Sequence, residues 1–458
     1  MKFLKTGLIW LSLAAMGMSG CSTTQTRVLS INSLTSDASN DGSFRGLEAL
    51  ATGYDEKPGN RVNIIYLHGV GWIENPDDKP LANEFIKGLA NAYNLEVDDK
   101  AVSSLCGRDT TDEATNVNNH IYIKEDSPKT YHTALPGVDL TLDDLVCLDR
   151  QVLHISDDLE YVIYRVFWDE IFWQSLQEPH VGYDDKLNTD GVAALRRKYN
   201  RYLKDKLINF GFSDAILYLG AVGGEIREAI YGAMCAANLD AGGFEFKEQG
   251  KRVTADEICQ IANETSVETD QFVFVTESLG SKIAYDIMRD VMTDDKDTVH
   301  DAMIENTEFI MLANQVALLN LSDLGTTKPK VPPYMPPEER PTIVAFSEVN
   351  DFLSYELIPY YRSLIKNGER HSVFVGEDKR DISDNIVAMT GFNMIDMRVE
   401  FADPLIPLVK SFVDPLRAHN GHSAQPELMR YMVCGADNGK LRTAGCIADL
   451  VGPPIEKK

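Results

Sequence analysis

The sequence contains the three residue types of a serine-based proton relay, in the order serine, acid, histidine. The candidates are Ser278, Asp351 and His419. A serine hydroxyl is a weak nucleophile at neutral pH, so it needs a histidine as general base, and the histidine needs a carboxylate that orients it. These residue types in this order predict acyl-transfer chemistry, with a covalent intermediate on Ser278.

The histidine is chosen by elimination. The chain has nine histidines, and only His371, His419 and His422 lie well beyond the serine. His371 ends a charged stretch and is expected on the surface. The other two lie in a loop after the last expected strand, where the Asn420-Gly421 turn signal predicts that the chain reverses just after His419. His419 is therefore the predicted base, and His422 is expected near the mouth of the site.

The acid is expected at the end of the strand 342–346. Asp351 follows this strand closely, and in open α/β sheets the sites lie at the carboxyl ends of the strands. Two alternatives stay open at this point. Glu348 is a competing carboxylate, and Asn350-Asp351 is also a good sequence for an Asx turn that merely closes the strand.

The serine lies between a predicted strand and a predicted helix. The run 271–275 is mostly β-branched or aromatic and indicates a buried strand, and the apolar residues after Gly280 recur at helical spacing. A sharp turn would lift the hydroxyl of Ser278 clear of the sheet and direct the helix N-terminus toward it. Gly280 allows strand and helix to pass closely. Thr276 stands where glycine is usual, so a helix simply capped by the serine remains an alternative.

These residues together resemble the α/β-hydrolase superfamily, at its esterase and lipase end. The resemblance covers roughly Arg61 to Ser423 and includes a strand followed by His68-Gly69. In similar hydrolases an Ala-His-x-Gly pattern carries the base, as at 418–421 here. The resemblance implies an α/β-hydrolase fold, with helices on both faces of a mostly parallel central sheet. It also implies that Val70 and Leu279 donate the backbone N–H groups of an oxyanion hole, with His68 as a structural residue.

The leading prediction is a serine hydrolase that cleaves carboxylic esters without a metal or an organic cofactor. The substrate would be a small-molecule or lipid ester. An acyltransferase would use the same acyl-enzyme and differ only in the acceptor. A hydrolase-like envelope protein that binds a lipid or a protein partner without catalysis is the alternative from another class, and Thr276 is the feature in its favour.

The N-terminus predicts export and a lipid anchor. Residues 1–20 combine a basic start with a short apolar stretch, as in a secretory signal peptide. The ending Ser19-Gly20-Cys21 resembles the bacterial lipobox, which implies acylation of Cys21. By resemblance to Gram-negative lipoproteins, Ser22 after this cysteine implies the outer membrane. The anchor would make the membrane a partner of the protein.

Composition and cysteine use agree with an exported protein that does not bind nucleic acid. The 458 residues carry a net charge of −26 and contain no basic run, whereas a nucleic-acid binder would be expected to carry a basic patch. Six cysteines remain after Cys21, and an even number in an exported chain predicts disulfides. Six cysteines allow 15 connectivities, and the sequence does not choose among them. The expected pairing is local, Cys106 with Cys147, Cys235 with Cys259 and Cys434 with Cys446. No CxxC motif or Cys/His cluster indicates zinc.

The expected organisation is a signal peptide at 1–20, a flexible tether at 21–45 and one α/β domain at 46–458. A polar, irregular insertion is expected at about 94–150. Strands are expected at 28–31, 61–67, 161–168, 215–219, 309–313, 342–346 and 393–401. Helices are expected at 81–93, 192–208 and 226–237 and after Ser423 as a cap, and the proline-rich segment 326–341 is expected to be a surface connection.

Overall fold

The structure, a computed structural model, describes residues 26–34, 42–51, 60–69, 81–97, 120–132, 136–172, 176, 204–244, 251–265, 272–293, 307–324, 331–332, 335–336, 339–370, 382–402, 404–406 and 409–450. The strands are β1 (Arg27–Leu34), β2 (Phe44–Arg45), β3 (Asn60–Leu67), β4 (His120–His132), β5 (Asp139–Ser156), β6 (Leu159–Phe167), β7 (Lys251–Thr254), β8 (Phe272–Glu277), β9 (Glu308–Leu312), β10 (Thr342–Glu348), β11 (Asn393–Glu400), β12 (Pro404–Ile406), β13 (Val409–Val413), β14 (Gly435–Asp437) and β15 (Lys440–Leu441).

The α-helices are α2 (Leu47–Ala51), α3 (Leu81–Ala92), α4 (Asp169–Phe172), α8 (Ser213–Leu219), α9 (Gly223–Ala241), α10 (Ala255–Thr265), α11 (Leu279–Thr293), α13 (Val316–Leu319), α14 (Leu357–Arg370), α15 (Ile382–Thr390), α16 (Pro415–Asn420), α17 (Pro426–Cys434) and α18 (Ile447–Leu450). Three further segments are the π-helix η3 (Lys204–Phe212) and the 3₁₀-helices η4 (Asn320–Asp323) and η6 (His422–Ala424).

Ten of the described strands form one large, mostly parallel sheet in the order β1-β11-β10-β9-β8-β3-β6-β5-β4-β7. The six strands from β11 to β6 are parallel to their neighbours, while β1 and β5 pair antiparallel with β11 and β6. β6, β5 and β4 lie on one side of β3, and the next strands of the parallel part along the chain, β8 to β11, lie on its other side. The strand order therefore reverses beside β3 and β8, and such a switch point is where open α/β sheets bind ligands.

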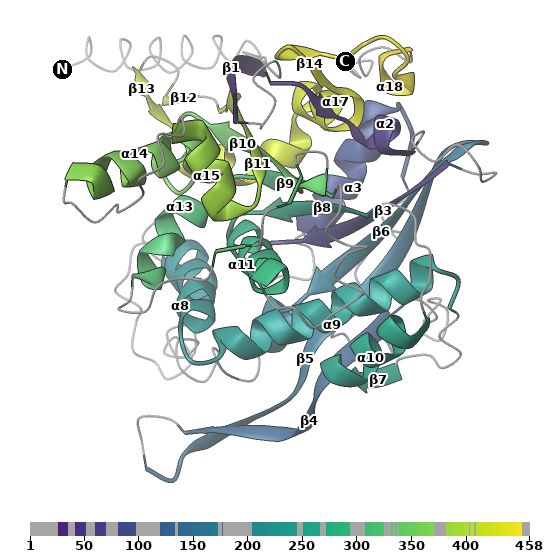
Figure 1. The fold of residues 1–458 in the computed structure, drawn as a ribbon, viewed down its shortest axis with the longest axis vertical. Coiled ribbons are helices and arrows are strands. Elements are labelled where there is room, and N and C mark those ends of the chain that lie inside the picture. The colour runs from purple at the N-terminus through teal and green to yellow at the C-terminus, as the bar shows by residue number, and fades with distance from the viewer. Residues whose placement is uncertain are drawn as a thin grey trace, which may run out of the picture.

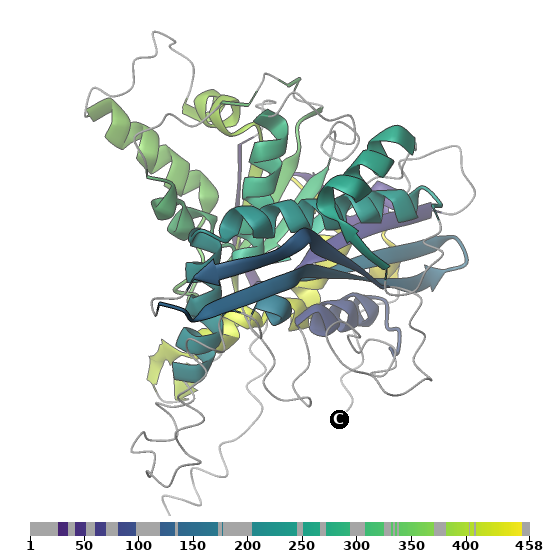
Figure 2. The ribbon, with the colours of Figure 1, turned by 90° about the horizontal axis from the view of Figure 1, so that it is seen from below.

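Helices cover both faces of the sheet, as Figures 1 and 2 show. One apolar core lies between the sheet and α9, α10, α11, α14 and α15, and the other lies between the sheet and α2, α3, α17 and α18. Side chains of β8 alternate between them: Phe272 and Phe274 enter the first core, Val273 and Val275 the second. A strand buried on both faces is apolar along its whole length, which explains the continuous apolar runs in the sequence.

Two segments expected to be irregular or flexible contain strands of this sheet. Within 94–150, the predicted insertion, β4 and β5 pair with each other and extend the sheet, and their far end projects from the body (Figure 1). Within 21–45, the predicted tether, β1 pairs antiparallel with β11 at the sheet edge and is longer than the strand expected at 28–31. The expectation of an irregular insertion was therefore wrong, whereas the strand expected at 28–31 is confirmed as part of β1. Edge and protruding strands expose a face to water and are therefore polar, which hid their extent in the sequence.

The strand expected at 215–219 is also wrong, since these residues form α8. A short apolar run is compatible with either a buried strand or a buried helix segment. The helix expected at 192–208 reaches the described residues only at its end, where Lys204 begins the π-helix η3. The strands expected at 61–67, 161–168, 309–313, 342–346 and 393–401 and the helices at 81–93 and 226–237 are confirmed to within a few residues.

Disulfides tie helices to their neighbours. Cys235 of α9 is bonded to Cys259 of α10, and Cys434 at the end of α17 is bonded to Cys446. Both pairs confirm the predicted local pairing. Cys147 of β5 is disulfide-bonded as well, to a cysteine outside the described residues. Because a cross-link restricts the unfolded chain, each native disulfide is expected to contribute about 2–4 kcal/mol to stability.

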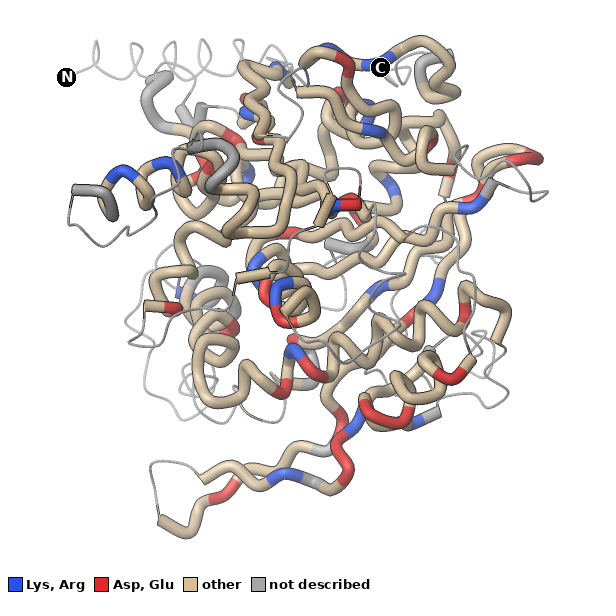
Figure 3. Tube along the Cα trace, in the orientation of Figure 1, with Lys and Arg blue, Asp and Glu red and all other residues tan. Residues whose placement is uncertain are grey.

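No helix in the described part of the chain is long and apolar enough to cross a membrane. Charged residues of both signs lie on the β4–β5 projection, whereas those of α10 are all acidic (Figure 3). The predicted signal peptide and the predicted lipidation site Cys21 lie outside the described residues.

Candidate active site

Ser278 occupies the tight connection between β8 and α11. Its φ angle is +54°, in the left-handed region that side chains other than glycine rarely adopt. Its N–H donates a hydrogen bond of 2.9 Å to the carbonyl oxygen of Leu312 at the end of β9. Such a conformation costs about 1–2 kcal/mol and persists only where the surrounding structure holds it.

Two glycines make this connection possible. A Cβ added to Gly69 would lie 2.5 Å from Cβ of Ser278, and one added to Gly280 would overlap the carbonyl oxygens of Leu67 and His68. Gly69 therefore lets the loop after β3 touch the serine, and Gly280 lets α11 pass close to the end of β3, as the sequence predicts. Thr276 fits without a glycine, since it is fully buried and its hydroxyl is paired with that of Ser281 at 2.9 Å.

His419 lies on the short helix α16, and not in the loop predicted from the sequence. Asp414 caps this helix by accepting hydrogen bonds from the N–H groups of Leu416 and Arg417, and Pro415 stands at its first position. The helix ends at Gly421, where a Cβ would collide with the Arg417 carbonyl oxygen and the Phe401 ring. The Asn-Gly signal therefore marks a helix end, and not a simple reversal of the chain.

Asp351 follows β10 and serves two purposes at once. One carboxylate oxygen accepts the N–H of Leu353 at 2.9 Å, which is the Asx turn considered from the sequence. The other oxygen lies 2.8 Å from Nδ1 of His419. Burial would raise the pKa of Asp351, but the hydrogen bond and charge of His419 and the Leu353 N–H hold this pKa below its ordinary value.

Glu348, the competing acid, has a different role. Its carboxylate accepts hydrogen bonds from the N–H and side-chain amide of Asn350 and from the N–H groups of Phe401 and Ala402. It thereby joins the ends of β10 and β11 and supports the turn that carries Asp351.

The three candidate residues meet in one hydrogen-bonded chain. Nε2 of His419 lies 2.7 Å from Oγ of Ser278, and Nδ1 of the same ring lies 2.8 Å from Asp351. All three residues are buried, with 4–8% of each residue's surface exposed. In this arrangement the imidazole can take the serine proton while the carboxylate fixes its orientation and balances its charge.

No family model, curated protein or solved structure matches the chain. The functional argument therefore depends on the geometry of the site itself.

One of the two expected oxyanion donors can be placed. Leu279 is the first residue of α11, so its N–H has no acceptor within the helix and lies at the positive end of the helix dipole. Val70 lies outside the described residues. His68, just before it, has Nδ1 2.8 Å from the Gly69 carbonyl oxygen and Nε2 3.3 Å from Asp169, which agrees with a structural role.

His422 is buried, and not at the mouth of the site as predicted. Its Nδ1 lies 3.0 Å from the carbonyl oxygen of His419, and its ring meets Phe401 edge-on. Burial lowers the pKa of His422 to about 4, so the ring is neutral near pH 7. Ser423 is not the cap of α17, because Gln425 precedes this helix, whose first residue is Pro426.

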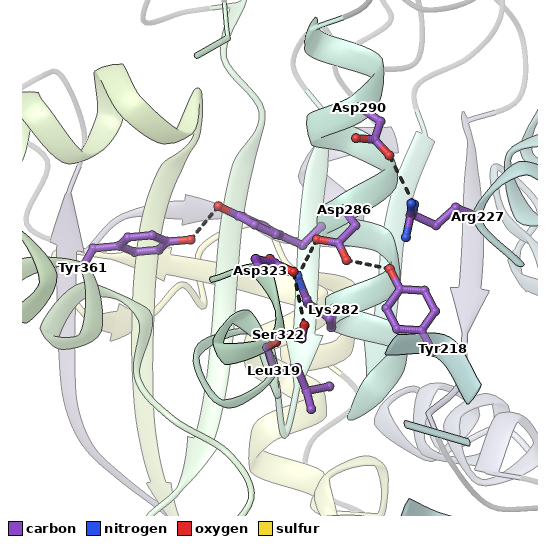
Figure 4. Close-up of polar contacts among 10 residues, drawn as sticks. Tyr218, Arg227, Lys282, Asp286, Asp290, Leu319, Ser322, Asp323 and Tyr361 are labelled. Atoms are coloured by element: carbon purple, nitrogen blue, oxygen red, sulfur yellow. Dashed lines mark hydrogen bonds and ion pairs between the residues drawn. The ribbon is translucent and has the colours of Figure 1, made fainter. Parts of the chain in front are cut away.

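Two buried charges near the serine were not identified from the sequence. Glu277 ends β8, and Lys282 lies in the first turn of α11. Lys282 is fully buried and lies 2.7 Å from both Asp286 and Asp323, while Tyr218 donates to Asp286 (Figure 4). This network joins α11 to η4 and α8. The signal available in the sequence was a charge placed inside an apolar pattern, at 277 in a strand and at 282 in a helix.

No group of three or more His, Cys, Asp or Glu side chains in the described ranges could hold a metal ion.

Proposed function

We propose that the protein is a serine hydrolase that cleaves carboxylic esters through an acyl-enzyme on Ser278. The observation that supports this proposal is the hydrogen-bonded chain from Ser278 through His419 to Asp351, with the serine held at a positive φ. Helix capping by a serine does not require a histidine hydrogen-bonded to the serine hydroxyl, nor a buried carboxylate hydrogen-bonded to that histidine.

The mechanism follows from the geometry. Nε2 of His419 takes the proton of Ser278 as Oγ attacks the ester carbonyl carbon, and the negative charge moves to the carbonyl oxygen. The N–H of Leu279 can stabilise this oxyanion, and a donor of this kind typically lowers the barrier by about 3 kcal/mol. The imidazolium then protonates the departing alcohol. Water deprotonated by His419 finally attacks the acyl-serine and releases the acid.

The low pKa of Asp351 suits this cycle. An ionised carboxylate accepts the Nδ1–H of His419, so Nε2 is unprotonated and faces the serine before the attack. The same negative charge then stabilises the imidazolium that forms.

An α/β-hydrolase fold is part of the proposal. It is supported by the elbow-like turn at the end of β8, the acid after β10, the histidine after β13 and the close approach of Gly69 to Ser278. A lipid anchor at Cys21 and an outer-membrane location remain proposals drawn from the N-terminal sequence.

A fluorophosphonate probe tests the function, because it forms a covalent bond only with an activated serine. Wild-type protein should be labelled and should hydrolyse nitrophenyl esters, and Ser278→Ala should lose both properties. Ser213→Ala is the matched control, since Ser213 also lies at the start of a helix, α8, but its hydroxyl donates to the Asn209 carbonyl oxygen. Absence of labelling of folded wild-type protein, or equal labelling of Ser278→Ala, would refute the proposal.

A further inference from the structure

Glu277 is a buried carboxylate directly before Ser278 that the relay does not use. It is the last residue of β8, and only 5% of its surface is exposed. Burying a carboxylate is costly unless hydrogen bonds and charges compensate. Its partners therefore indicate what it does.

The partner of Glu277 lies on the segment that carries the base. Ser423 of η6, four residues after His419, donates its hydroxyl to Oε1 of Glu277 at 2.6 Å. His422 of the same turn holds the His419 carbonyl oxygen through its Nδ1. On its other side η6 contacts α3 so closely that a Cβ on Gly88 would overlap the Ser423 carbonyl oxygen. The segment after His419 is thus fixed between β8 and α3.

The hydrogen bond with Ser423 matters for Glu277 as well. Burial raises the pKa of Glu277, and the hydrogen bond from Ser423 and the nearby histidines His419 and His68 offset part of this rise. The same hydrogen bond joins the strand that carries Ser278 to the segment that carries His419.

We propose that Glu277 is a positioning residue for the base. Its carboxylate holds the His419 segment against the strand that carries Ser278. The inference rests on the proposed function for its catalytic consequence, but the effect on His419 is a property of the folded protein whatever the reaction.

The decisive measurement is the position of the His419 ring, followed by NMR in histidine-labelled protein at one pH and assigned through His419→Ala. Glu277→Leu removes the acceptor for Ser423, whereas Glu277→Gln keeps the shape and an acceptor. The His419 ring resonances should shift in Glu277→Leu and stay close to wild type in Glu277→Gln. Glu308→Leu is the matched control, since Glu308 is also buried but begins the neighbouring strand β9, and Glu277 is in register with Leu312 at the other end of that strand. This control should leave the His419 resonances unchanged.

Ester hydrolysis supplies a second measurement. Ser423→Ala and Glu277→Leu both remove the hydrogen bond, so both should lower kcat with little change in KM, and Glu277→Gln should retain most of the wild-type kcat. A displaced base should cost roughly 10- to 100-fold in kcat, as expected for a misplacement of up to about 1 Å. Unchanged His419 resonances in Glu277→Leu, or full kcat in both Ser423→Ala and Glu277→Leu, would overturn the proposal. Wild-type protein without esterase activity would overturn the proposed function instead, and the NMR comparison would still decide the role of Glu277.

Discussion

Gly69→Ala is the sharpest perturbation that the structure offers, because one methyl group would be placed directly against the candidate nucleophile. The new Cβ would lie 2.5 Å from Cβ of Ser278, 2.7 Å from the carbonyl oxygen of Glu277 and 3.1 Å from Oγ of Ser278. The φ angle of Gly69 is outside the left-handed region, so alanine introduces no backbone strain. The effect is therefore purely steric.

The magnitude follows from these distances. Non-bonded carbon atoms rest at about 3.5–4.0 Å, so Ser278 or the loop after β3 must move by roughly 1 Å. A shift of that size typically costs on the order of 100-fold in rate, because Oγ no longer meets both His419 and the ester carbonyl. Inserting a methyl group into a packed site should also lower the free energy of unfolding by about 1–3 kcal/mol.

The assay compares the rate of fluorophosphonate labelling and the thermal midpoint of Gly69→Ala with those of wild type. Gly224→Ala is the matched control, since Gly224 is exposed in α9 and an added Cβ there would meet nothing within 4 Å. It should label at the wild-type rate and gain at most about 1 kcal/mol of stability, because alanine favours helix more than glycine does. Wild-type labelling by a folded Gly69→Ala variant would contradict the close approach of the loop to the serine.

His419→Ala should lower kcat about as far as Ser278→Ala does, because relay members act as a unit. His422→Ala should retain more activity than His419→Ala, since it removes only a contact to the His419 carbonyl oxygen; esterase assays on the folded variants decide this, and the reverse ranking would move the base to His422. Lys282→Met should lower the free energy of unfolding by about 3 kcal/mol in urea titrations, because it leaves the half-buried Asp286 without its cation. Asp323→Asn should cost clearly less, since its side chain is 49% exposed, and equal losses in the two variants would contradict the assigned burial.

The sequence by itself determined the elements whose pattern is local. The apolar run at 271–275 indicated a strand buried on both faces, and helical spacing after Gly280 indicated α11. The order serine, acid, histidine narrowed the candidates to a few residues. These inferences succeeded because strand and helix periodicity and turn signals act over short stretches of chain.

Only the tertiary structure decided which carboxylate meets the histidine. Asp351 follows β10 and Glu348 ends it, and the sequence favoured Asp351 but left Glu348 open as a competing acid. Asp351 lies 2.8 Å from His419, whereas Glu348 binds backbone N–H groups at the ends of β10 and β11. The orientation of a side chain after a strand depends on what packs against it, and here that is a helix about 70 residues further along the chain.

The edges of the sheet and the buried charges were likewise decided by tertiary contacts. β1 lies near the start of the chain and pairs with β11, which lies near its end. The sequence of a polar edge strand contains no local signal that indicates which distant strand it pairs with. Glu277 and Lys282 look like solvated charges in the sequence, yet each is buried because a distant segment brings a partner, Ser423 to the first and Asp323 to the second. A buried charge is stable only when its compensating groups arrive together, and their arrival is a property of the assembled fold.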